Sequence, residues 1–140
     1  MAAKVLSFLL LVAVASQGYA QTINEVALDD QHVSFISHPL YARVITIPKS
    51  PFDTLLACYI TFPSGVMYEA YPNSNIPFED IMYASATPPF NTCAVGFRGV
   101  PASRSGSYEL RSLVQHDADT LTLARQTFHL TITESEVGMP

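Results

Sequence analysis

The sequence predicts an all-β protein, an antiparallel β-sandwich of about seven to nine strands. Segments that alternate apolar and polar residues recur every roughly eight to fifteen residues, with turn residues between them. The chain after residue 20 contains no amphipathic pattern long enough for a substantial helix. In addition, each of the two cysteines begins an apolar row of period two, Cys58/Ile60/Phe62 and Cys93/Val95/Phe97. Such rows are typical of half-buried strands that face one core.

The first twenty residues have the pattern of a secretory signal peptide. Lys4 precedes an apolar run over residues 5–15, and the small residues Gly18 and Ala20 stand before the expected cleavage point. The run is too short for a membrane span, which needs roughly 20 apolar residues. We therefore expect residues 1–20 to be removed and residues 21–140 to form a single secreted, extracellular domain without membrane insertion.

The charge balance limits the partners. Without Lys4 the chain has a net charge of −6, six basic against twelve acidic side chains, with no run of like charges. A nucleic acid or an anionic membrane would require a basic patch, so we expect neither as a partner.

The cysteine count predicts one disulfide. Cys58 and Cys93 are the only cysteines, and in an exported chain an even count most simply forms a bridge, here between the two facing rows. Metal binding is a weaker interpretation because there is no Cys-x-x-Cys pair and no histidine at ligand spacing.

Several strands follow from local patterns. Residues 22–36 indicate two short strands or one strand bent at Asp29–Gln31. Strands are expected at 41–47, 55–62, 66–71, 93–100, 108–114 and 127–133. Phe62-Pro63-Ser64-Gly65 fits a type I turn of a hairpin.

The remaining segments are less regular. Prolines between residues 72 and 92 exclude a central strand there, although 81–85 could pair at a sheet edge. The polar residues 115–120 predict a turn, and residues 134–140 a frayed tail.

Three segments together resemble the immunoglobulin-like domains of small secreted arthropod proteins. They are Cys58-Tyr-Ile-Thr-Phe-Pro-Ser-Gly65, Cys93-Ala-Val-Gly-Phe-Arg-Gly-Val100 and Arg104-Ser-Gly-Ser-Tyr-Glu-Leu110, within a stretch from Ala42 to Thr133. The resemblance implies that Tyr108 is a corner tyrosine, with a buried ring and a hydroxyl bonded to nearby backbone.

The chain departs from this family at defined positions. Arg104 stands where the family's corner has Asp, and Leu110 stands where the usual inter-sheet cysteine would follow the corner tyrosine. The strand around 43–47 has no cysteine and the chain has no Trp. The usual inter-sheet disulfide is therefore lacking, and the domain would depend on Cys58–Cys93 and on apolar packing.

Catalytic patterns are absent from the sequence. The four histidines form no i,i+2 pair on a strand and no His-Glu-x-x-His motif, and there is no Gly-x-Ser-x-Gly elbow. The acidic pairs Asp29/Asp30 and Glu79/Asp80 are better explained as solvated loop residues than as calcium ligands. We expect no enzyme activity, no metal and no cofactor.

An aromatic group in the proline-rich stretch is the candidate binding feature. Its members are Tyr68, Tyr71, Phe78, Tyr83 and Phe90. These rings either cover the core beneath a long loop or form a recognition surface, and the sequence leaves both interpretations open.

Three functions therefore remain. The first is a secreted, non-enzymatic recognition protein that binds an extracellular protein or glycan. The second is a carrier that holds a small apolar ligand between its sheets. The third, a hydrolase, is disfavoured by the lack of a catalytic motif.

Overall fold

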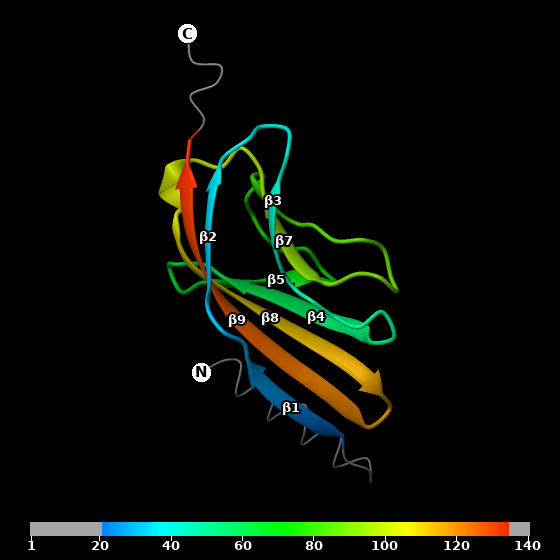
Figure 1. The fold of residues 1–140 in the computed structure, drawn as a ribbon. Coiled ribbons are helices and arrows are strands. Elements are labelled where there is room, and N and C mark those ends of the chain that lie inside the picture. Colours follow the sequence, from blue (N-terminus) through cyan, green and yellow to red (C-terminus); the bar gives the residue numbers. More distant parts are fainter. Residues whose placement is uncertain (1–20, 135–140) are drawn as a thin grey trace.

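Two β-sheets face each other in the computed structural model, which describes residues 21–134 (Figure 1). The larger sheet has the order β1-β9-β8-β4-β5, with β2 also paired to β9, and the smaller has the order β3-β7-β6. The strands are β1 Thr22–Ala27, β2 Gln31–Ile36, β3 Arg43–Ile47, β4 Thr54–Thr61, β5 Met67–Tyr71, β6 Ile81–Tyr83, β7 Cys93–Phe97, β8 Gly106–Asp117 and β9 Thr120–Thr133. This confirms the predicted β-sandwich. The predicted signal peptide, and the predicted tail beyond Glu134, lie outside the described residues.

The hairpin of β8 and β9 is much longer than the sequence patterns predict. The predicted strands covered only 108–114 and 127–133, whereas β8 extends to Asp117 and β9 begins at Thr120. The chain does turn within 115–120, as predicted, but the turn itself is confined to residues 118–119. Cross-strand pairing down to Asp117↔Thr120 holds these polar residues in the ladder.

Residues 22–36 form two strands, and both run parallel to β9. β1 pairs with the first half of β9 and β2 with the second half. The chain between them is fixed by the Leu28 N–H, which donates to the Arg125 carbonyl at 2.8 Å, and by the Gln126 side-chain amide, which donates to the Asp29 carbonyl at 2.8 Å. The chain therefore bends near Asp29, as expected, and these two hydrogen bonds hold the bend against β9.

The β4–β5 hairpin closes through the predicted turn. The Gly65 N–H donates to the Phe62 carbonyl at 2.8 Å, and Gly65 has a φ of +90°, which glycine adopts at little cost. Pro63 of this turn lies against the start of β8, because a Cβ added at Gly106 would lie 2.7 Å from the Pro63 Cγ. The turn therefore packs on the strand that leads to Tyr108.

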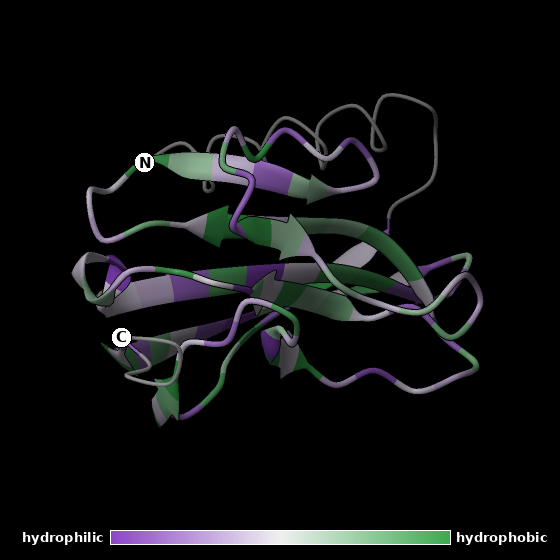
Figure 2. Cartoon of the chain, turned by 90° about the horizontal axis from the view of Figure 1, so that it is seen from above, coloured by the Kyte–Doolittle hydropathy of each residue, from purple (hydrophilic) through white to green (hydrophobic). Residues whose placement is uncertain are grey.

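The core between the sheets consists of the predicted rows. Ile60, Phe62, Val95, Phe97, Tyr108, Leu110, Phe128, Leu130 and Ile132 are all buried in one cluster. Phe62 and Phe97 each contact the Tyr108 ring edge-on, with ring centroids 5.2 Å apart. Figure 2 shows hydrophobic and hydrophilic residues along the strands, as expected when one face is buried and the other meets solvent.

The strands of the smaller sheet are shorter than predicted. β3 begins at Arg43 rather than Tyr41, and β7 ends at Phe97 rather than Val100. β6 lies at the sheet edge, as expected for residues 81–85, although it ends at Tyr83. Within residues 21–134 no helix has the length and hydrophobicity that a membrane span requires.

Candidate recognition site

Three connections meet at one end of the sandwich, on the right-hand side of Figure 1. They are the β3–β4 loop, residues 48–53, the β6–β7 loop, residues 84–92, and the β8–β9 turn, residues 118–119. We call this region the loop end. It lies opposite the β4–β5 turn, because β4 runs from the loop end to Phe62.

Lys49 joins two of these loops. Its ammonium donates to the carbonyls of Ser50 at 3.0 Å and Asp53 at 2.7 Å within its own loop, and to the carbonyl of Pro89 in the β6–β7 loop at 3.0 Å. An ammonium has three donors, so all of them are engaged. Lys49 therefore links the two loops through hydrogen bonds and is not a free surface charge.

Asp53 joins the same loop to the β8–β9 hairpin. Its carboxylate lies 2.9 Å from Nδ1 of His116, and Nε2 of His116 lies 2.6 Å from the Thr122 hydroxyl. In the adjacent turn the Asp119 N–H donates to the Asp117 carboxylate at 2.8 Å, and this hydrogen bond lowers the pKa of Asp117. Polar contacts thus connect all three segments of the loop end.

Two exposed phenylalanines lie in the two loops that Lys49 joins. Phe52 is 92 % exposed and Phe90 is 67 % exposed. Neither ring has a polar group, so each exposes apolar surface to water at an unfavourable free energy. Single exposed apolar residues are common, but these two occupy neighbouring loops that Lys49 holds together.

The five aromatic residues identified in the sequence have two different environments. Tyr68, Tyr71, Phe78 and Tyr83 are partly buried and packed against the core, whereas Phe90 is in solvent. Tyr68 and Phe78 both contact the Phe62 ring at 5.3 Å between centroids, and Tyr71 contacts Tyr83 at the same distance. Four rings therefore cover the core, and one belongs to the loop end.

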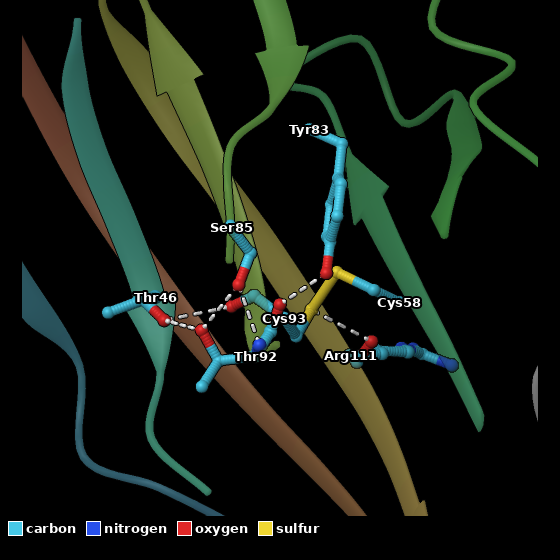
Figure 3. Close-up of a disulfide and its surroundings, with 7 residues drawn as sticks. All are labelled: Thr46, Cys58, Tyr83, Ser85, Thr92, Cys93 and Arg111. Carbon is cyan, nitrogen blue, oxygen red and sulfur yellow. Dashed lines mark hydrogen bonds between the residues drawn. A yellow bond between two sulfur atoms is a disulfide. The ribbon is translucent and has the colours of Figure 1, made fainter. Parts of the chain in front are cut away.

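The predicted disulfide is present and connects the two sheets. Cys58 of β4 is bonded to Cys93 of β7, and both residues are fully buried (Figure 3). Beside it, the Tyr83 hydroxyl donates to the Thr92 carbonyl at 2.9 Å, and the Thr92 N–H donates to the Ser85 hydroxyl at 2.7 Å (Figure 3). The bridge and these bonds fix the end of the β6–β7 loop that leads from Phe90 into β7.

At the other end of the sandwich, Tyr108 has the geometry expected of a corner tyrosine. Its ring is 1 % exposed and its hydroxyl donates to the Arg104 carbonyl. Burial raises the pKa of the Tyr108 phenol. The Arg104 guanidinium lies 4.2 Å above the Phe78 ring and is 3.3 Å from the Asp80 carboxylate, so the residue that departs from the family pattern still anchors the corner.

A serine, a histidine and an aspartate meet on the outer face of the larger sheet. The Ser107 hydroxyl lies 2.7 Å from Nδ1 of His129, and Nε2 of His129 lies 2.8 Å from the Asp30 carboxylate. The order is that of a nucleophile, a base and a carboxylate, but Ser107 is exposed and the Asp30 side chain is 58 % exposed. In a Ser-His-Asp triad the aspartate is buried, so we assign this cluster to joining the residue before β2 to β9.

The sequence reasoning did not identify Lys49, Phe52 or the serine–histidine–aspartate cluster. Phe52 lies between the predicted strands at 41–47 and 55–62, and its place between Pro51 and Asp53 is a signal for exposure. The cluster combines residues far apart in the chain, so no local motif could reveal it. Across residues 21–134 no three histidine, cysteine or acidic side chains are arranged to hold a metal ion.

Comparison with known proteins identifies the fold. No family model and no curated protein sequence matches the chain. Among solved structures, murine CRIg is similar over 73 % of this chain and 92 % of its own, with 6 % identity and a TM-score of 0.53. The Ig1 domain of mouse SynCAM 2 is similar over 76 % of this chain and 93 % of its own, with 12 % identity and a TM-score of 0.46. The similarity to CRIg, together with the two facing sheets, shows that the domain has an immunoglobulin-like fold.

Proposed function

We propose that this protein is a secreted, non-enzymatic recognition protein that binds an extracellular protein or glycan through its loop end. The observation that supports this most directly is the pair of exposed phenylalanines, Phe52 and Phe90, on loops joined by Lys49. Aromatic side chains that fill pockets on a partner supply much of the binding free energy at protein interfaces.

The Lys49 contacts favour binding because they fix the loops before a partner arrives. A flexible loop loses conformational entropy when a partner orders it, and that loss subtracts from the affinity. The Lys49 contacts and the Asp53–His116 contact hold the backbone on either side of Phe52. The loop that carries Phe52 is therefore already ordered and loses little conformational entropy on binding.

The alternative, a carrier of a small apolar ligand, is less well supported. The rings of Phe62 and Phe97 both pack on the Tyr108 ring between the sheets, where such a ligand would be held. The exposed apolar rings are at the loop end instead. The exposed rings therefore support recognition at the surface rather than binding of a ligand between the sheets.

An extracellular location agrees with the covalent structure. The Cys58–Cys93 bridge forms and persists in oxidising compartments such as those along the secretory route. Cleavage of residues 1–20 would deliver the domain to the exterior, as in the small secreted arthropod proteins that the sequence resembles.

The test is capture of partners from extracellular fluid by the immobilised domain, with bound species identified by mass. We expect Phe52→Ser and Phe90→Ser each to weaken capture by about tenfold or more, the effect of a hot-spot residue worth roughly 1.4 kcal/mol. Both rings are exposed, so the melting temperature should change little.

Val66→Ser is the matched control, because Val66 is 47 % exposed but lies in the β4–β5 turn at the opposite end. It should leave capture unchanged. Equal loss in all three variants would indicate nonspecific adhesion, and unchanged capture in both phenylalanine variants would exclude the loop end as the contact surface.

A further inference from the structure

Gln21 occupies the position directly after the predicted signal peptide. The proposed function includes secretion, and the inference about Gln21 rests on it, because removal of residues 1–20 makes Gln21 the first residue of the chain. Its α-nitrogen then becomes a free amine. Only a glutamine at the very start of a chain carries a free amine and a side-chain amide in one residue.

The fold places Gln21 just outside the first strand. β1 pairs with β9 from Thr22 onward, and the Thr22 N–H donates to the Asp119 carbonyl at 2.8 Å. The main-chain nitrogen of Gln21 takes no part in this ladder. A reaction at that nitrogen therefore leaves the pairing of β1 with β9 intact.

The side chain of Gln21 lies on the turn between β8 and β9. Its Nε2 donates to the Ala118 carbonyl at 2.9 Å, and the contact is exposed to solvent. Water can replace an exposed hydrogen bond of this kind at little cost in free energy. The amide is therefore free to leave the turn and approach the α-nitrogen of its own residue.

We propose that Gln21 is converted to pyroglutamate after the signal peptide is cleaved. The neutral α-nitrogen attacks Cδ of its own side chain and forms a five-membered lactam, while the bond from Cδ to Nε2 breaks. The α-nitrogen loses one hydrogen, and Nε2 takes it and leaves as ammonia, so neither an oxidant nor another reactant is required.

General chemistry favours this ring closure. The amine and the amide belong to one residue, so the reaction has the advantage of an intramolecular step. The ordinary pKa of an α-amino group is close to neutral pH, so a substantial fraction of the amine is the uncharged nucleophile.

The modification changes the charge beside the loop end. The α-ammonium of an unmodified Gln21 would add a positive charge next to the β8–β9 turn, which carries the acidic Asp117 and Asp119 (Figure 1). A lactam nitrogen is uncharged, so cyclisation removes this counter-charge from the two carboxylates. The mature protein therefore has an uncharged first residue next to the proposed contact surface.

Mass spectrometry of protein secreted by eukaryotic cells that express the full chain tests the proposal. The product should begin at residue 21 and be lighter by one ammonia than a chain with an intact Gln21. Stepwise chemical degradation from the N-terminus should release no residue. After treatment with pyroglutamyl peptidase it should read from Thr22 onward.

Gln21→Ala is the variant, because alanine has no amide and the hydrogen bond it removes is exposed. It should keep the mass of an unmodified chain, release its first residue without the peptidase, and melt as the wild type does. Gln31→Ala is the matched control, since Gln31 lies within β2 and never has a free amine. It should lose ammonia as the wild type does.

Two kinds of result would overturn the proposal, and they separate it from the secretion on which it rests. A secreted chain that begins at residue 21 with its amide intact, or a loss of ammonia that persists in Gln21→Ala, would exclude the modification and leave secretion supported. A chain that keeps residues 1–20, or begins at another residue, would exclude the modification together with the predicted cleavage.

Discussion

Gly106 and Gly65 provide a matched pair for testing how the β4–β5 turn packs on the start of β8. Both have positive φ, +148° and +90°, so alanine is strained at either position. They differ in their surroundings. A Cβ at Gly65 meets nothing within 4 Å, whereas a Cβ at Gly106 would lie 2.7 Å from the Pro63 Cγ and 3.1 Å from its Cβ.

The expected costs follow from that difference. Positive φ costs a non-glycine residue about 1–2 kcal/mol, which we expect as the loss of unfolding free energy for Gly65→Ala. At Gly106 a steric term of about 1–3 kcal/mol adds to it, because the proline ring is rigid and belongs to a tight turn. Gly106→Ala should therefore cost about 2–5 kcal/mol.

The assay is equilibrium unfolding in urea, with the free energy obtained by linear extrapolation. Pro63→Ala removes the nearer contact atom, so combined with Gly106→Ala it should recover at least about 0.5 kcal/mol relative to the sum of the single effects. Equal losses at the two glycines, or strict additivity with Pro63→Ala, would show that the turn does not press on β8 as described.

Three other perturbations test the core, the corner and the bridge. Leu130→Ala should cost about 2–5 kcal/mol and His129→Ala on the outer face much less, and equal melting shifts would mean that the faces of β9 are misassigned. Because burial raises the pKa of Tyr108 above 10.0, its contribution is present below pH 10.0 and lost as the pH rises further, so Tyr108→Phe should flatten the alkaline decline of the melting temperature. Reducing the bridge should cost roughly 4 kcal/mol for a sequence separation of 35, and alkylation of folded protein without reductant should label neither Cys58 nor Cys93.

The sequence predicted what depends on short-range alternation. Phe128, Leu130 and Ile132 alternate with polar residues, and all three are in the core. The disulfide was predictable because both cysteines begin such rows. The first half of β9 was missed because Gln126, a buried polar residue, interrupts the pattern, and its burial depends on the distant Asp29 carbonyl.

The candidate recognition site was predictable only in part. Clustering of aromatic residues with prolines identified Phe90, but it could not separate that exposed ring from Tyr83, which covers the core and donates to the Thr92 carbonyl. Lys49 shows the limit most clearly. Its third donor reaches Pro89, 40 residues along the chain, and no local pattern encodes that contact.

The parallel pairing of β1 and β2 with β9 constrains how the protein is made. Residues 22–36 are among the first of the domain to leave the ribosome, yet their hydrogen-bonding partners lie in residues 120–133, which leave it last. Until then Val33 and Phe35, which pack on the core in the finished domain, have no strand to join. Residues 22–36 therefore stay unpaired during synthesis, where they are exposed to chaperones and to mispairing. The larger sheet can form only when synthesis is nearly complete.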